Sequence, residues 1–311
     1  MTAEEEQCFQ LAVGAARQLV SQSLAHAERV SARMGDRVAA AVLTSPVGVD
    51  RARMLGGEHP IAFQHILEHV EATSNALVSQ LTGLKLLLDN DTFHPLPASV
   101  IARAIAEVAA SCAWIVRPAD SNTRFARGYA ALFFALQRGI SDAAPGAGLK
   151  EQRDELIEQL KDTQVVLEHR LKGGIQQEDI GQVFVGAGPN KDRGRAKVSF
   201  TYSQRVQDEI PRVGPLYSAL SGAVHGSHAS IRQSWKTPDS GARAIAHVVT
   251  VSTEAWSAAV HEWVGVQAGP FLNERDRQNV LLSIPEATYA RVAGKIAAAV
   301  KQLGSANETG Q

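Results

Sequence analysis

Cysteine is scarce in this sequence, and neither sign of charge predominates. The 311 residues include two cysteines, Cys8 and Cys112, on separate segments with helical spacing. Two thiols are too few for a zinc ribbon or a thiolate cluster, and we expect both to stay reduced rather than form a disulfide. The 31 basic residues balance 32 acidic ones. This balance argues against a strong overall field for duplex nucleic acid but leaves room for a local basic patch.

Long apolar runs are also missing, and the composition of the first residues does not predict a secretory leader. The start, "MTAEEEQCFQ", is acidic where a secretory signal is basic. No apolar run approaches the roughly 18 residues that a membrane span requires. We therefore expect a soluble, cytoplasmic protein without a membrane partner.

The alternation of strands and helices that is typical of an α/β fold is absent, and no internal repeat is visible. Apolar residues instead recur at helical spacing. Within residues 98–117 they form the stripe Ile101, Ile105, Val108, Cys112 and Ile115. The sequence predicts an all-α, multi-helix bundle. We expect an N-terminal helical arm and linker at 1–58, a bundle core at 59–270, and a C-terminal helix with a frayed tail at 271–311.

Two stretches interrupt the helical pattern. Residues 44–60, "TSPVGVDRARMLGGEHP", hold two prolines and three glycines and predict a loop or linker. Residues 175–209 are rich in glycine and β-branched residues and predict an irregular insertion with one short hairpin. Candidates there for phosphate contacts and base stacking are Lys191, Arg193, Arg195, Lys197, Phe200 and Tyr202. A solvated basic loop is the simpler interpretation.

One short motif has the spacing of a metal site. "HILEH", residues 65–69, matches the H-x-x-E-H pattern, in which two histidines on one helix face hold zinc and the glutamate acts as base. Such a site needs a third ligand, and nothing downstream singles one out. His65, Glu68 and His69 are therefore the candidates for a zinc hydrolase, and half-exposed helix residues are the alternative.

A second motif places three polar residues on one helical face. In "LYSALSGAVHGSH", residues 216–228, Tyr217, Ser221 and His225 are four residues apart. The Ser221 and His225 side chains can therefore meet. A regular helix offers no backbone oxyanion hole, because its amide groups are already hydrogen-bonded, so acyl transfer is not expected.

Two segments resemble a known family. "ARAIAEVAASCAWIVRPADSNTRFARGYA", residues 102–130, resembles a helix of large actinobacterial helical-bundle proteins whose domain has no assigned function. "YSALSGAVHG", residues 217–226, resembles their second marker helix. Both segments are also similar to the HEPN superfamily, which implies a HEPN-like bundle over residues 60–270.

The resemblance implies a catalytic pair and a polar cluster. HEPN ribonucleases use an arginine followed closely by a histidine, and His225 would be that histidine. No arginine precedes it at the family's spacing, so Arg124 or Arg127 would have to come from a neighbouring helix. The catalytic candidates are His225, Arg127 and Tyr217. The ligand-binding candidates are Arg103, Glu107, Arg117, Arg124, Arg127, Tyr217, Ser221 and His225.

The first hypothesis for function is a cytoplasmic, homodimeric bundle. Its polar cluster would bind a nucleotide, an RNA phosphate or another small anionic ligand, without a metal or other cofactor. The family likeness alone implies a role in stress or phage defence. The alternatives are a metal-independent ribonuclease, the zinc hydrolase, and a scaffold protein that associates through a charged helix predicted at 150–172. The same polar cluster would serve only to fix helix register if no ligand binds it.

Overall fold

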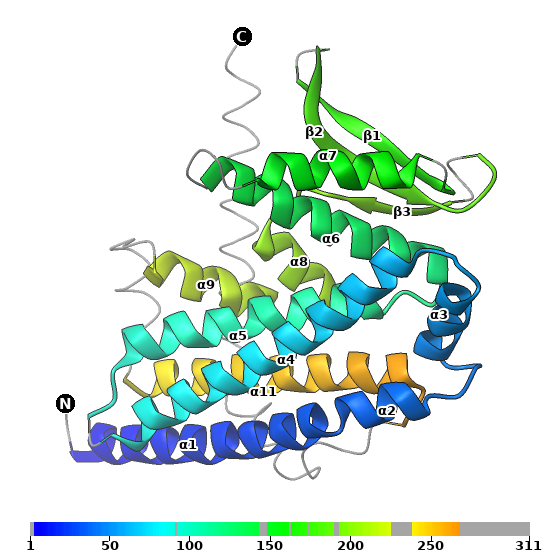
Figure 1. The fold of residues 1–311 in the computed structure, drawn as a ribbon. Helices are drawn as coiled ribbons and strands as arrows, with labels where there is room; N and C mark the ends of the chain where they lie inside the picture. The colour runs from blue at the N-terminus through cyan, green and yellow to red at the C-terminus, as the bar shows by residue number, and fades with distance from the viewer. Residues whose placement is uncertain are drawn as a thin grey trace.

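The computed structural model describes residues 3–90, 92–142, 148–161, 163–172, 175–189, 193–224 and 238–267. Within these ranges the chain forms ten helices and one three-stranded sheet (Figure 1). The fold class predicted from the sequence, a mainly all-α helical bundle, is confirmed. The C-terminal helix predicted at 271–311 and the candidate His225 lie outside the described residues.

Four long helices form the body of the fold. They are α1 (Ala3–Ala32), α4 (Pro60–Asp89), α5 (Pro95–Val116) and α11 (Pro238–Val264). Each packs against two others in the closed circuit α1–α4–α5–α11 (Figure 1). The segment expected to be an N-terminal arm thus contributes α1 to this circuit, because Ala16, Val20 and Ala27 bury one face of that helix.

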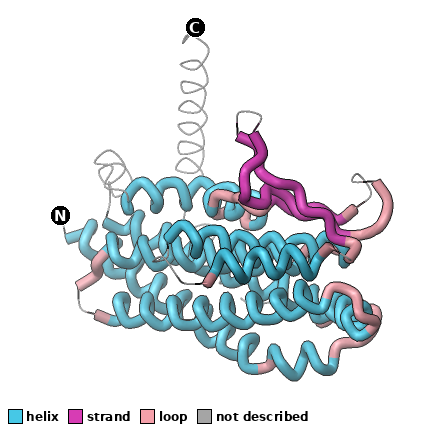
Figure 2. The backbone as a smooth tube through the Cα atoms, turned by 45° about the horizontal axis from the view of Figure 1, so that its top comes forward, coloured by secondary structure: helices cyan, strands magenta, loops and turns pink. Residues whose placement is uncertain are grey.

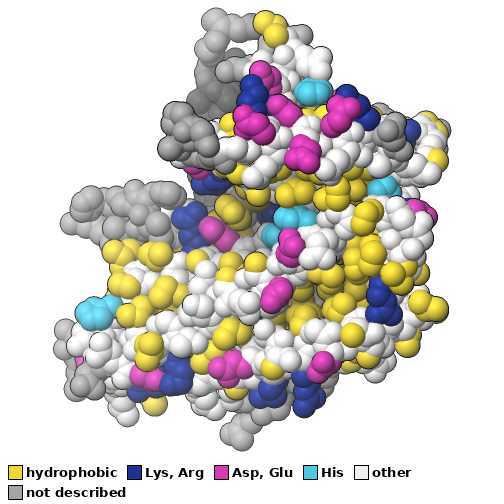
Figure 3. Space-filling model, viewed as in Figure 1, with side chains coloured by type: hydrophobic (Ala, Val, Ile, Leu, Met, Phe, Trp, Pro, Cys, Tyr) yellow, Lys and Arg dark blue, Asp and Glu magenta, His cyan; other side chains and the backbone are white. Residues whose placement is uncertain are grey.

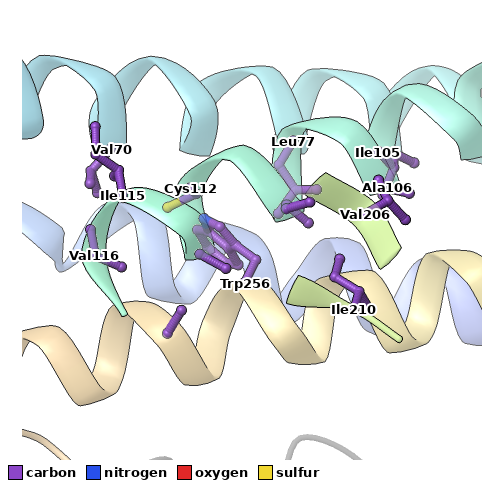
Figure 4. Close-up of a cluster of buried hydrophobic side chains, with 14 of the residues drawn as sticks. Val70, Leu77, Ile105, Ala106, Cys112, Ile115, Val116, Val206, Ile210 and Trp256 are labelled. Carbon is purple, nitrogen blue, oxygen red and sulfur yellow. The ribbon is translucent and has the colours of Figure 1, made fainter. Parts of the chain in front are cut away.

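The core is densest around α5. Ile105, Cys112 and Ile115 from the predicted stripe are completely buried, as are the alanines at 102, 106, 109, 110 and 113. Small residues let neighbouring helices approach closely, and the fully buried indole of Trp256 on α11 lies beside Cys112 (Figure 4). Burial raises the pKa of the Cys112 thiol to about 12, so this cysteine is an inert packing residue.

The helix α5 is long and apolar enough to cross a membrane. This differs from the expectation that no apolar segment of the chain reaches that length. α5 is the one helix among the described residues that does so, and its apolar window is 61% buried inside the protein. This degree of burial is typical of the core helix of a soluble protein, as expected from the sequence.

The loop predicted at residues 44–60 is wrong, because most of it is helical. After α2 (Met34–Ala40) comes α3 (Pro46–Leu55). Ser45 caps α3, its Oγ accepting a hydrogen bond from the Gly48 N–H at 3.1 Å, and Gly56 follows the last turn. Proline favours the first helical position and glycine the position after the end, so the residues that suggested a loop instead delimit a short helix.

The charged helix predicted at 150–172 is also corrected. α6 (Ser121–Asp142) is followed by α7 (Leu149–Leu160), which ends twelve residues earlier than expected. From Val165 to Arg170 buried or half-buried residues alternate with exposed ones, which suits a strand better than a helix. The strands are β1 (Val165–Lys172), β2 (Ile175–Val185) and β3 (Gly194–Lys197), in the antiparallel order β1-β2-β3.

The insertion predicted at 175–209 is more regular than expected. It contains β2, β3 and a short helix, α8 (Tyr202–Glu209), and α9 (Gly214–Val224) follows. β2 and β3 pack on α6, whereas α8 and α9 pack on α5. The protein therefore has two layers, with α6, α7 and the sheet lying above α4 and α5 (Figures 1 and 2).

The contact between β3 and α6 yields a stability prediction. A Cβ on Gly194 would lie 2.2 Å from the Asn122 carbonyl carbon and 2.3 Å from the Thr123 nitrogen. We expect Gly194→Ala to lower the free energy of unfolding by about 1–3 kcal/mol, because the backbone of α6 cannot move aside. Urea denaturation measures this loss.

The matched control is Gly14→Ala in α1, where a Cβ would meet nothing within 4 Å. Alanine favours a helix over glycine by about 1 kcal/mol, so this variant should be as stable as the parent or more so. Equal stabilities for the two variants would contradict the proposed close approach of β3 to α6.

Candidate functional site

The structure divides the predicted site residues into three groups. Arg103, Glu107 and Tyr217 form one cluster between α5 and α9. Arg117 and Arg127 belong to a second cluster that includes α8. Arg124 lies in a third place, in a buried ion pair with Asp50 of α3. The single central cluster expected from the sequence is therefore not formed by the described residues.

A polar stripe along α5 links the first two groups. Arg103, Glu107, Ser111, Trp114 and Arg117 follow one another at intervals of four, four, three and three residues, so they lie on one helical face. This spacing covers about 21 Å of helix. The opposite side of α5 faces α4 and α11 in the apolar core.

The first cluster is a hydrogen-bonded triad. The Arg103 Nε donates to Glu107 Oε1 at 2.8 Å, and the Tyr217 hydroxyl donates to the same oxygen at 2.6 Å. The Arg103 guanidinium also lies against the Tyr217 ring, 5.4 Å from its centroid. Burial and the Glu107 carboxylate raise the pKa of Tyr217 to about 12, so the hydroxyl stays protonated at neutral pH. Ser221 lies half-buried one turn further along α9.

The second group is the arginine–aromatic cluster, made of Trp114, Arg117, Arg127, Phe200, Arg205 and Glu209. Arg117 Nη1 donates to the Glu209 carbonyl at 2.9 Å and to Glu209 Oε2 at 3.1 Å. Arg127 lies 3.6 Å from the other carboxylate oxygen of Glu209, and its Nη1 donates to the Trp114 carbonyl. The Glu209 carboxylate therefore forms ion pairs with both arginines.

Arg205 is the unusual member of this cluster. Its residue surface is 5% exposed, and its guanidinium carbon lies 3.9 Å from the Trp114 ring centroid and 3.2 Å from that of Phe200. Its Nη1 donates to Ser111 Oγ at 3.2 Å, but its buried Nη2 has no hydrogen-bond partner. Within the described part of the chain, no carboxylate lies within 4 Å of it. Burial lowers the pKa of Arg205 to about 9.

Two histidines connect this cluster to the surface. His69 Nε2 lies 3.1 Å from the same Ser111 Oγ, and its ring centroid is 6.3 Å from that of His65. Burial, with smaller effects of His65 and Arg205, lowers the pKa of His69 to about 4, and burial also lowers the pKa of His65. Both rings are therefore neutral at pH 7.

His65 lines a shallow groove of about 350 Å³. The other lining residues are Pro60, Ile61, Gln64, Glu68 and Leu132. Figure 3 shows a hollow between the α6 layer and the α4–α5 layer, with histidine, acidic and basic side chains around it. The apolar wall comes from both layers, and the polar rim comes from α4.

The zinc motif acquires no further ligand within the described ranges. They contain no group of three or more histidine, cysteine, aspartate or glutamate side chains able to hold a metal ion. Glu68 instead accepts a hydrogen bond from Gln64 at 2.9 Å. His69 Nε2 lies 3.1 Å from Ser111 Oγ.

Arg124 is fully occupied in the interior. Its side chain is 1% exposed and that of Asp50 is 0% exposed. Nε and Nη2 each donate to the Asp50 carboxylate at 2.7 Å, Nη1 donates to the Pro118 and Ala119 carbonyls, and Nη2 also reaches the Pro46 carbonyl. All five N–H donors thus have acceptors, so Arg124 is a structural residue rather than a ligand-binding one.

Sequence reasoning missed Ser111, Trp114, Arg205 and Glu209. A signal for α8 was present, because Thr201 followed by Gln204 has the spacing of a capping box, and Thr201 Oγ1 does accept from the Gln204 N–H at 3.3 Å. Arg205 and Glu209 then follow at helical spacing. Of the basic insertion residues, Arg195 and Lys197 are exposed on β3, whereas Lys191 lies outside the described residues. Phe200 stacks on Arg205.

No protein-family model, curated protein sequence or solved structure matches this chain. The assignment of the site therefore depends on its geometry alone. The resemblance to the HEPN superfamily stays a prediction from the two sequence segments.

The buried ion pair yields the first prediction for this region. Asp50→Ala leaves the Arg124 guanidinium without a counter-charge, and we expect the free energy of unfolding to fall by about 3–5 kcal/mol in urea denaturation. The double variant Asp50→Leu with Arg124→Met removes both charges and should be less destabilised than Asp50→Ala. A double variant at least as unstable as the single one would show that the pair does not act through its charges.

The histidines yield a prediction for acid stability. Burial lowers the pKa of His69, and also that of His26 on α1, to about 4, against an ordinary value of 6.5. Between pH 6.5 and 4 these two histidines are therefore protonated in the unfolded chain but neutral in the folded one. The stability that their neutral forms contribute is fully present above pH 6.5 and is lost as the pH falls towards 4. We expect the urea midpoint to decrease steadily over this range.

The variant His69→Gln should weaken this pH dependence, because one of the protonation sites is removed. The matched control is His94→Gln, at an exposed histidine before α5. Urea midpoints at several pH values between 7 and 4 measure both. Identical slopes for the parent, His69→Gln and His94→Gln would contradict the role of His69.

Proposed function

We propose that this protein binds a phosphate-bearing anion, a nucleotide or an RNA phosphate, at the arginine–aromatic cluster in the cytoplasm. The observation that carries the proposal is Arg205, a buried guanidinium with no carboxylate within 4 Å among the described residues and with one unpaired amino group. The cluster contains three arginines and one glutamate, so it has an excess of positive charge. The proposed site therefore lies nearer to α8 than the cluster expected from the sequence.

The energetic argument concerns uncompensated charge. A buried guanidinium without a counter-charge costs several kcal/mol, and proteins retain such groups mainly at functional sites. Glu209 acts on Arg205 only from beyond 4 Å, so a phosphate oxygen near Nη2 would supply both the missing acceptor and a negative charge in contact. Trp114 and Phe200 both lie against the guanidinium, so a ligand would have to approach the buried Nη2 along the edge of the guanidinium plane.

The neighbouring groups suit the same ligand. Arg127 lies at the Trp114 ring, its guanidinium carbon 5.0 Å from the centroid, and shares Glu209 with Arg117. Ser111 and the neutral His69 add hydrogen-bonding atoms beside Arg205. The groove at His65 supplies an apolar wall close to this polar chain, as expected where an organic part of a ligand binds next to its phosphate.

The alternatives gain less support. A metal-independent ribonuclease would need His225, which lies outside the described residues, and Arg124 is already committed to Asp50. Arg127 is the remaining cation for that hypothesis. The zinc hydrolase lacks a third ligand within the described ranges. A scaffold acting through one charged helix at 150–172 loses its second half, because residues 165–172 form β1. Stress or defence roles stay implications of the family likeness.

Arg205→Met tests the proposal, since methionine keeps the apolar stem and removes the charge. Isothermal titration calorimetry with inorganic phosphate, ATP and a short single-stranded RNA distinguishes a free phosphate, a nucleotide and a nucleic acid as the source of the anion. We expect the parent to bind at least one of them and Arg205→Met to bind it roughly tenfold to hundredfold more weakly. The control is Arg138→Met, at the exposed end of α6.

Urea denaturation of the same variants distinguishes a loss of ligand binding from a loss of stability. Replacing an uncompensated buried charge by an apolar residue of similar length should leave the stability unchanged or raise it. Arg205→Met should therefore combine a higher or equal urea midpoint with lost binding. Unchanged binding in Arg205→Met, or no binding of any of the three probes by the parent, would overturn the proposed function.

A further inference from the structure

The strand β1 has one edge that no described strand pairs with. In the order β1-β2-β3, β1 lies at the outside, while the far strand β3 is covered by α6. The sheet stands out from the helical layers, with the β1–β2 hairpin at its end (Figures 1 and 2). An outer strand presents a row of backbone N–H and C=O groups to which another strand can add.

The strand β1 is continuous along this edge. The register with β2 shifts between Glu168 and His169 and again between His169 and Leu171. Glu168 pairs with Gln182 and His169 with Ile180, so the extra residue at the first shift belongs to β2. At the second shift, three residues of β2 oppose one of β1. The bulges therefore lie on β2 and leave the eight residues of β1 unbroken.

The side chains of β1 alternate in a way that suits a second strand. Val166, Glu168 and Arg170 are exposed, whereas Leu167 and His169 between them are half-buried. Glu168 and Arg170 therefore point to the same open face, with opposite charges two residues apart. Two large apolar side chains, Leu171 and Ile175, are also exposed, at 66% and 69%.

Symmetry limits how β1 can pair with a copy of itself. Directly opposed residues of an antiparallel pair have their side chains on the same face of the sheet. A two-fold axis that relates two copies of β1 must therefore pass between two copies of the same residue, which then oppose each other. An axis at Glu168 would oppose two glutamates, and an axis at Arg170 would oppose two arginines. An axis at His169 opposes Glu168 of each copy to Arg170 of the other and sets Leu167 opposite Leu171. This register alone joins opposite charges at both positions.

We infer that a second copy of this chain pairs with the free edge of β1, antiparallel and centred on His169. The six-stranded sheet that results runs across both copies. Each Glu168–Arg170 pair opposed across the strands stabilises the dimer modestly, whereas like charges in the same places would destabilise it. Eight residues of strand cover less surface than a standard stable interface, so the dimer is a weak one whose population depends on protein concentration. The inference is independent of the anion site, which lies on other elements.

The experiment is sedimentation velocity of the full-length protein over a wide range of concentration. We expect the parent to shift from monomer towards dimer as its concentration rises. Glu168→Arg places arginine opposite arginine, Arg170→Glu places glutamate opposite glutamate, and each should weaken the dimer by about tenfold or more. The charge-swapped double variant, Glu168→Arg with Arg170→Glu, should regain the dimerisation of the parent.

The control is Glu155→Arg, at an exposed position of α7 outside the strand, and it should dimerise as the parent does. Far-ultraviolet circular dichroism checks that all variants remain folded, which is expected because both β1 positions are exposed. A parent that stays monomeric at every concentration would overturn the inference. A dimer that survives both single charge reversals, or that the double variant fails to restore, would also overturn it.

Discussion

The packing of α5 is the constraint on which the rest of this structure depends. The helix lies between α4 and α11 and also contacts α6, α8 and α9. Its buried alanines bring these neighbours close, and large side chains such as Trp256 fill the remaining space. A helix enclosed on so many sides has one narrow face left for polar groups. That face carries Arg103 of the triad and Trp114 of the arginine–aromatic cluster, so the positions of both clusters follow from how α5 is packed.

The arginines on and around this face of α5 differ in how many of their N–H donors have acceptors. Arg103 shares Glu107 with the Tyr217 hydroxyl, and Arg117 and Arg127 share Glu209. Arg205 alone in this series depends on aromatic rings and one serine hydroxyl. The contrast with Arg124 is informative, because that equally buried arginine has acceptors for all its donors. Complete satisfaction marks Arg124 as a structural arginine, whereas the incomplete satisfaction of Arg205 is the basis of the proposed anion site.

The small sheet serves a different purpose from the bundle. β2 and β3 cover α6, and the close approach at Gly194 fixes β3 against the first turn of that helix. Because α6 also carries Arg127, the sheet supports one wall of the proposed anion site from behind. Its outer strand, β1, turns Val165 towards the core but presents the opposite charges of Glu168 and Arg170 to the surroundings. One element thus both supports the site and offers an edge for self-association.

The sequence by itself determined the long helices, the apolar stripe of α5 and the four-residue spacing of Arg103 and Glu107, because these patterns depend only on near neighbours along the chain. It misjudged α3 and β1, where proline, glycine and alternating residues had two local interpretations. Only the tertiary structure decided which arginine meets which acceptor. Arg124 pairs with Asp50 across 74 residues, and Arg205 reaches Ser111 across 94. Such partners depend on how the helices pack in three dimensions, and no periodicity along the chain predicts them.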